Sequence, residues 1–161
     1  MSSYLSVTGT VTQLQPAEDE NGSSYGCALI MTIQTFYQGI AVFTLSGDTY
    51  VVDNVNIKPG SQVTVFYDGN APAPLIYPPR YKAVLAASSG RYQYYLGEFY
   101  NSFVSTDQTI QLNGDIPINF VLPNGQTYSG AIVGKTVLVE YTASSRSIPA
   151  FVTPERVIVF C

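Results

Sequence analysis

The sequence contains no histidine. Ser-His-Asp and Cys-His nucleophiles need an imidazole, as do most zinc and non-haem iron sites, so these classes are excluded. Its two cysteines cannot supply the four ligands of a structural zinc site without other donors. No phosphate-binding glycine motif precedes a helical pattern. We therefore expect no catalytic residues, no metal site and no cofactor. An enzyme would need a mechanism based on carboxylates alone.

Charged residues make up only 11% of the chain, against about 25% in a typical soluble domain. The net charge is −4, and of the seven basic residues only Arg80 and Lys82 lie close together in sequence. Nucleic-acid-binding proteins usually carry a basic stripe, so we do not expect nucleic acid as a partner. Ser, Thr, Asn, Gln and 13 Tyr take the place of charge. Such a surface repels copies of itself weakly, which favours self-association.

Long apolar runs are also missing. No stretch approaches the ~18 to 20 apolar residues of a membrane span, so membrane insertion is not expected. The first ten residues, MSSYLSVTGT, lack the basic and apolar regions of a signal peptide. We expect synthesis in the cytoplasm. The final location could be extracellular or on a spore or cell surface, reached by lysis or a dedicated export route.

Most of the sequence consists of short runs of apolar and β-branched residues separated by turn residues. No segment shows a convincing helical period. Turn signals include Asn21-Gly22, Asp68-Gly69 and Asn113-Gly114. The pattern predicts an all-β fold. The strands are expected at 5–14, 28–36, 40–45, 49–52, 63–67, 82–86, 92–104, 109–112, 116–122, 136–141 and 157–160.

The order of features repeats along the chain. Gly60 and Gly134 precede similar strands, and both these glycines and the tyrosines Tyr67 and Tyr141 are 74 residues apart. Gly9 and Gly97 each lie within a long predicted first strand. We infer two tandem β-repeats, at 1–88 and 89–161, with a hinge at Ser88-Ser89-Gly90.

A long first strand bent at a glycine, a meander, a Gly turn and a closing strand are typical of a small OB-like barrel without its helix. The sequence therefore predicts two tandem OB-like barrels. The alternative is a single merged β-sandwich built from strands of both halves.

Two segments carry a family resemblance. The stretch 66–81, FYDGNAPAPLIYPPRY, and the later RSIPA at 146–150 with Thr153-Pro154 resemble signatures of an uncharacterised family from Gram-positive, often spore-forming anaerobic bacteria. The resemblance covers almost the whole chain. It implies no known activity and transfers no site.

The proline-rich segment within this stretch is a candidate contact loop, because prolines fix an extended backbone. It either presents its apolar residues to a partner on a rigid rim, or those residues plug the end of the barrel while the prolines prevent edge pairing. The candidate residues are Pro72, Pro74, Leu75, Ile76, Tyr77, Pro78 and Pro79.

The strand predicted after the hinge would direct three tyrosines to the same face, namely Tyr92, Tyr94 and Tyr100. They form either a ligand-binding aromatic face or a packing surface between the repeats.

The two cysteines have three possible states. Cys27 and Cys161 either bond to each other, cross-link neighbouring subunits or remain free thiols.

These features favour a non-catalytic structural protein, a self-assembling subunit of a filament or surface layer whose partner is a second copy of itself. Predicted edge strands at 2–12 and 157–160 could pair between subunits by β-augmentation. The alternative is a monomeric OB-like binding module for carbohydrate, peptide or protein.

Overall fold

The computed structural model describes residues 3–161, a range that contains 13 strands, one short 3-10 helix and no α-helix. The prediction of an all-β fold is confirmed. The chain divides into two compact units, Met1–Gly90 and Arg91–Cys161, which we call unit 1 and unit 2. The hinge predicted from sequence, Ser88-Ser89-Gly90, lies at the end of unit 1.

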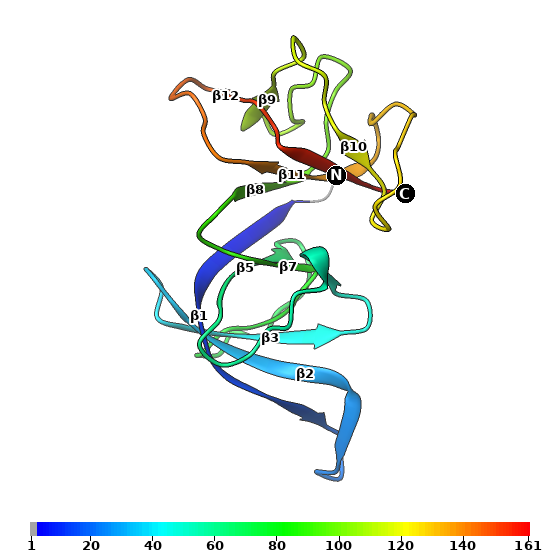
Figure 1. The fold of residues 1–161 in the computed structure, drawn as a ribbon. Helices are drawn as coiled ribbons and strands as arrows, with labels where there is room; N and C mark the ends of the chain where they lie inside the picture. The colour runs from blue at the N-terminus through cyan, green and yellow to red at the C-terminus, as the bar shows by residue number, and fades with distance from the viewer. Residues whose placement is uncertain (1–2) are drawn as a thin grey trace. The chain divides into compact units, whose positions relative to one another are not determined.

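Each unit has its own set of strands (Figure 1). Those of unit 1 are β1 (Tyr4–Glu18), β2 (Ser24–Thr35), β3 (Ile40–Ser46), β4 (Tyr50–Val51), β5 (Gln62–Asp68), β6 (Arg80–Lys82) and β7 (Leu85–Ser88), with the 3-10 helix η1 (Val52–Asn54) after β4. Those of unit 2 are β8 (Gln93–Gly97), β9 (Ile110–Leu112), β10 (Phe120–Val121), β11 (Thr136–Tyr141), β12 (Ala150–Val152) and β13 (Arg156–Phe160).

The described strands of unit 1 form one mixed sheet in the order β4-β7-β5-β1-β2-β3-β6. Neighbours are antiparallel except β3 with β6 and β4 with β7, which are parallel. The long strand β1 pairs with β5 through its first half, Tyr4–Thr10, and with β2 from Gly9 onward. It bends along its length as it passes from one partner to the other (Figure 1).

Gly9 lies where β1 changes partners. A Cβ atom at this position would lie 2.2 Å from the carbonyl oxygen of Gln34 in β2. Only glycine allows the two backbones to approach this closely, which is the usual reason for glycine inside a strand. The sequence-based interpretation of Gly9 as the bending point of a long first strand agrees with this geometry.

The described strands of unit 2 form a four-stranded sheet, β10-β13-β11-β8, and a two-stranded pair, β12-β9. The pairs β8–β11 and β11–β13 are antiparallel, whereas β10 is parallel to β13 and β9 is parallel to β12. β13 therefore has a neighbour on each side, as β1 has in the sheet of unit 1. The prediction that the segments 2–12 and 157–160 form edge strands is wrong for the described strands β1 and β13.

The two units share a pattern of pairing. The unit 1 pairs β1–β5, β5–β7, β3–β6 and β4–β7 have the same orientations as the unit 2 pairs β8–β11, β11–β13, β9–β12 and β10–β13. The registers also correspond, because Gly9 lies opposite Val63 and Gly97 lies opposite Val137. A cis peptide bond precedes Pro78 in unit 1 and Pro149 in unit 2.

Within residues 3–161, hydrogen bonding does not close either sheet into a barrel, so the tandem OB-like barrels predicted from the sequence are not confirmed. The end strand β6 and the strand β7, which is second from the opposite end of the unit 1 sheet, are nevertheless consecutive in the chain. Only Ala83 and Val84 separate them.

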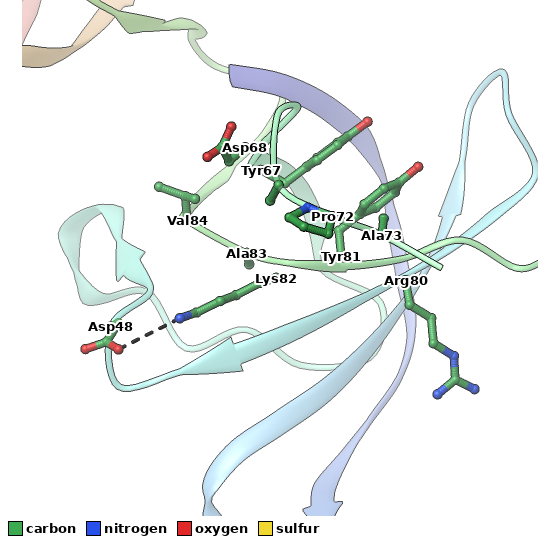
Figure 2. Close-up of a pocket in the computed structure, with 11 residues that line it drawn as sticks. Asp48, Tyr67, Asp68, Pro72, Ala73, Arg80, Tyr81, Lys82, Ala83 and Val84 are labelled. Carbon is green, nitrogen blue, oxygen red and sulfur yellow. Dashed lines mark ion pairs between the residues drawn. The ribbon is translucent and has the colours of Figure 1, made fainter. Parts of the chain in front are cut away.

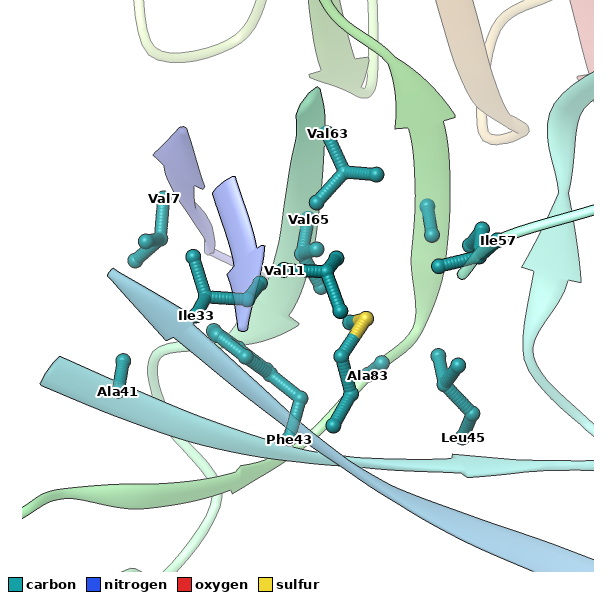
Figure 3. Close-up of a cluster of buried hydrophobic side chains, with 12 residues drawn as sticks. Val7, Val11, Ile33, Ala41, Phe43, Leu45, Ile57, Val63, Val65 and Ala83 are labelled. Carbon is teal, nitrogen blue, oxygen red and sulfur yellow. The ribbon is translucent and has the colours of Figure 1, made fainter. Parts of the chain in front are cut away.

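Each unit has its own hydrophobic core, built by the alternating side chains that strands direct to one face. In unit 1 the inward residues of β3, Ala41, Phe43 and Leu45, alternate with half-buried neighbours. They pack with valines of β1 and β5 and with Met31 and Ile33 of β2 (Figure 3). The buried core of unit 2 consists of Phe99, Ile110, Leu112, Ile132, Val137, Val139, Val152, Val157 and Val159.

The expected strand at 92–104 is much shorter in the structure. β8 ends at Gly97, and the chain then turns at Tyr100–Phe103, where the amide of Phe103 donates to the carbonyl of Tyr100. Phe103 has a positive φ of 62°. An aromatic residue rarely adopts this conformation, so the identity of Phe103 does not itself signal the turn.

Candidate functional site

A cleft of about 400 Å³ opens in unit 1 beneath the start of the proline-rich loop. Its floor is the segment Arg80–Val84, and Tyr67 and Asp68 at the end of β5 form one wall (Figure 2). The loop residues Ala71–Ala73 and the β3–β4 turn residue Asp48 complete it. The cleft exists because β5 and β6 diverge. β7, and not β6, pairs with β5, and only over Val63–Phe66.

Two tyrosine side chains occupy the space where these strands diverge. The rings of Tyr67 and Tyr81 stack with centroids 4.0 Å apart and an interplanar angle of 15° (Figure 2). Phe43, which is fully buried, contacts both rings from the core. Burial, together with the neighbouring hydroxyl of Tyr81, raises the pKa of Tyr67 to about 12. The Tyr67 phenol is therefore neutral at physiological pH and can donate and accept hydrogen bonds.

Charged side chains of both signs lie around the cleft. Lys82 and Asp48 form an ion pair at 4.0 Å, and both side chains are largely exposed. Arg80 and Asp68 are the other charged lining residues. An aromatic wall with polar groups at its rim suits non-covalent binding of a ligand that offers both an apolar face and hydrogen-bonding groups. Sequence reasoning missed this cleft, although its signal was present: Tyr67 and Tyr81 flank the proline-rich segment on either side.

The apolar residues of the proline-rich loop point away from the core. Leu75 is fully exposed, and Ile76 and Tyr77 are exposed at 51% and 72%. The interpretation that these residues plug the end of a barrel is therefore wrong. Among the prolines of the predicted contact loop, Pro72 lines the cleft, and the carbonyl of Pro79 accepts a hydrogen bond from the amide of Val42 in β3.

Tyr77 holds the loop against the β2–β3 turn. Its hydroxyl accepts a hydrogen bond of 3.4 Å from the amide of Ile40. A Cβ atom at Gly39 would lie 2.6 Å from the same hydroxyl, so glycine is needed for this contact. The loop and the turn are thus in contact, and we call their exposed apolar residues together the unit 1 patch. Its residues are Phe36, Tyr37, Ile40, Leu75, Ile76 and Tyr77.

A smaller exposed apolar surface lies in the corresponding loop of unit 2. Ile148 is 92% exposed and Phe151 is 43% exposed. The exposed Arg146 precedes them in the same loop. Hydrogen bonds among Ser145, Ser147 and the carbonyl of Pro149 hold the loop in a compact shape. We call Arg146, Ile148 and Phe151 the unit 2 patch.

Both cysteines are free and exposed in the structure. Cys27 lies at a groove of about 360 Å³ lined mainly by apolar residues, among them Leu14, Leu29 and Leu45. Cys161 follows the last strand of unit 2. A cross-link between subunits remains a prediction.

The three tyrosines of the predicted aromatic face do not share a strand. Tyr94 lies in β8, Tyr92 precedes it, and Tyr100 lies in the turn after it. Tyr92 and Tyr94 make an edge-on contact at 6.5 Å, and Arg91 lies over the ring of Tyr92. The face expected from strand parity is therefore wrong, because β8 ends three residues before Tyr100.

A polar cluster that the sequence did not reveal organises the loop between β8 and β9. The hydroxyls of Tyr95 and the buried Ser105 both donate to the carboxylate of Asp107. Burial would raise the pKa of the Asp107 carboxyl, but hydrogen bonds from Ser105, Thr109 and Tyr95 outweigh it, and the pKa lies below its usual value. Burial raises the pKa of Tyr95 well above its usual range. These polar groups form hydrogen bonds with one another and with the backbone of the loop, which marks the cluster as structural.

Within residues 3–161 no three acidic or cysteine side chains gather in a way that could hold a metal ion. The same range contains no helix of the length and apolarity that a membrane crossing requires. Comparisons with models of known families, with curated proteins and with solved structures found no match.

Proposed function

We propose that this chain is a non-catalytic structural protein, a subunit that assembles with copies of itself into a filament or surface layer. The observation that carries the proposal is the unit 1 patch. Leu75 is completely exposed on a loop whose prolines restrict its backbone, and Tyr37 is almost completely exposed on the β2–β3 turn. Because a rigid apolar surface loses little conformational entropy on binding, it is well suited to a permanent contact.

The size of the patch supports the same function. Taking ~200 Å² for a full aromatic side chain, Phe36, Tyr37 and Tyr77 alone expose roughly 450 Å². The three aliphatic residues bring the patch above ~600 Å², beyond the largest patch of an ordinary monomer. A stable interface buries about 800 Å² on each partner. A surface of this size therefore provides most of one side of a lasting contact.

Tandem OB-like units remain part of this proposal. The shared pairing pattern of the two units supports a duplication, and in both the segment before the last strand pairs in parallel with an earlier strand. An extracellular location, or one on a spore or cell surface, is part of the same proposal. A repeated unit gives one subunit two similar sets of loops.

The test is the mass of the purified chain over a range of concentrations, measured by sedimentation velocity, with negative-stain electron microscopy of the same samples. We expect species well above 17.5 kDa that grow with concentration and form ordered polymers. A chain that stays monomeric at millimolar concentration, with and without reductant, would overturn the proposal.

One observation favours a second candidate, a monomeric binding module for a carbohydrate, peptide or protein. The stacked Tyr67–Tyr81 pair forms a ready aromatic wall in the unit 1 cleft. Flat sugar faces and proline rings both pack on such walls. Titration with oligosaccharide and proline-rich peptide arrays should then give saturable binding that Tyr81→Ala abolishes. An absence of binding while the chain polymerises eliminates this candidate.

A further inference from the structure

We propose that the subunits join head to tail, with the unit 1 patch of one copy binding the unit 2 patch of the next. This inference rests on the proposed function. A polymer of one kind of subunit needs at least two contact surfaces on each copy, because a single self-complementary surface closes into a dimer. The chain offers two exposed apolar surfaces, one on each unit.

The two patches are built by corresponding loops. The amide of Val84 donates to the carbonyl of Phe66 in unit 1, and the amide of Glu155 donates to the carbonyl of Glu140 in unit 2. The donors of these equivalent bonds are 71 residues apart, and so are Tyr77 and Ile148. Leu75-Ile76-Tyr77 of unit 1 therefore correspond to Arg146-Ser147-Ile148 of unit 2.

The corresponding residues differ in a complementary way. Unit 1 presents bulky side chains, whereas unit 2 has serines at 144, 145 and 147 around Ile148. Large apolar residues on one surface can pack over small residues and a single isoleucine on the other. Ile148 and Phe151 supply apolar contact for Leu75.

Charge favours the unlike pairing over either like pairing. A contact between two unit 2 patches would bring Arg146 against its own copy. A contact between two unit 1 patches would bring together units that carry three basic and six acidic residues each, a net −3. In the unlike pairing, Arg146 faces a surface that holds the exposed rings of Tyr37 and Tyr77. A guanidinium over a tyrosine face is attracted by the ring.

Two single substitutions distinguish the head-to-tail contact from contacts between two identical patches. Leu75→Asp places a charge in the unit 1 patch and Ile148→Asp places one in the unit 2 patch. Both side chains are almost completely exposed, so neither change disturbs a core. Ile116→Asp is the matched control, because Ile116 is exposed in unit 2 and belongs to neither patch. Circular dichroism and thermal unfolding show that each variant is folded.

The readout is sedimentation velocity of each variant alone and of equimolar mixtures. We expect Leu75→Asp and Ile148→Asp each to be monomeric, and their mixture to form a one-to-one dimer and nothing larger. That dimer uses the intact unit 2 patch of the first variant and the intact unit 1 patch of the second. The control Ile116→Asp should polymerise like the wild type.

Three results would overturn the proposal in different ways. Dimers of either single variant alone indicate like-with-like contacts. If the wild type polymerises but the mixture of the two variants stays monomeric, the interface lies elsewhere and the proposed function stands. The same holds if the wild type polymerises and the single variants still polymerise too. A monomeric wild type overturns both proposals.

Discussion

Equivalent positions in the two units hold an apolar pair of side chains in unit 1 and a charged pair in unit 2. In unit 1, Phe66 of β5 lies opposite Leu85 of β7, and both side chains are buried. In unit 2, the corresponding strands β11 and β13 bring Glu140 opposite Arg156. These two side chains form an ion pair in which Glu140 is only 3% exposed, and the guanidinium Nε donates to the carboxylate.

The pairing pattern therefore does not depend on one type of core contact. A hydrophobic pair and a buried ion pair fit the same strand register. A buried ion pair is weak evidence for stability, because desolvation of the charges offsets their attraction. Removing one partner is far more harmful, since it leaves a buried charge without compensation.

The largest effect we predict comes from breaking this pair. Arg156→Leu should lower the free energy of unfolding by about 3 to 5 kcal/mol, because Glu140 stays buried without its partner. The double variant Glu140→Phe with Arg156→Leu introduces the unit 1 pair into unit 2 and should recover most of that loss. Urea unfolding measures both. A double variant no more stable than Arg156→Leu contradicts the equivalence of the two positions.

The glycines of the two first strands should respond differently to a methyl group. A Cβ atom at Gly9 meets the backbone of Gln34, whereas at Gly97 it meets the ring of Tyr95 within the same unit. Backbone cannot move aside, but a side chain can. Gly9→Ala should therefore destabilise by about 2 to 3 kcal/mol and Gly97→Ala by about 1 kcal/mol, the range of overpacking. Equal losses in thermal unfolding would contradict this reasoning.

Alkaline pH should weaken both units through equivalent tyrosines. The pKa of Tyr67 rises from 10.0 to about 12, and burial also raises the pKa of Tyr141, its counterpart in unit 2. As the pH rises, these tyrosines therefore lose their protons in the unfolded chain before they do so in the folded one. Their contribution to the free energy of unfolding is fully present below pH 10 and is lost as the pH rises through their pKa values in the folded state. Urea unfolding at pH 8, 10 and 11 should show the decline. Tyr67→Phe and Tyr141→Phe should each make it less steep, and an unchanged slope in both would show that other groups cause it.

The smallest effects on stability concern the two exposed cysteines, one in each unit. Cys27→Ser and Cys161→Ser should each change the free energy of unfolding by less than about 0.5 kcal/mol, because both side chains are exposed. Their effect on cross-linking should be clear. After oxidation with a diazene oxidant, which accepts the two electrons and two protons of each disulfide, the wild type should give a covalent ladder on a non-reducing gel. Either variant has one thiol and should stop at dimers, and a ladder that persists in both variants would show that disulfides do not form it.

The strands that could be predicted from sequence are those with strong alternation and clear turn signals. β5, β11 and β13 begin and end within one residue of the predicted runs, because glycine turns or prolines precede them and one face is buried. The pair β9–β12 shows the limit. β12 is three residues long and pairs in parallel with a distant strand, so no local signal marks it.

The site was harder to predict for a physical reason. Leu75, Ile76 and Tyr77 look like core residues in a sequence, and only the contact of Tyr77 with Gly39 shows why they stay outside. The cleft depends on the divergence of β5 from β6, which is a property of long-range pairing. The turn after β8 was missed because Phe103 adopts a positive φ without being glycine.

The separation of strand pairing between the two units has an evolutionary consequence. Among residues 3–161 every strand of unit 1 pairs within unit 1 and every strand of unit 2 within unit 2. A gene could therefore gain or lose one whole unit without leaving a strand unpaired. The length of such a protein can change in steps of one unit, while each remaining unit diverges in its loops.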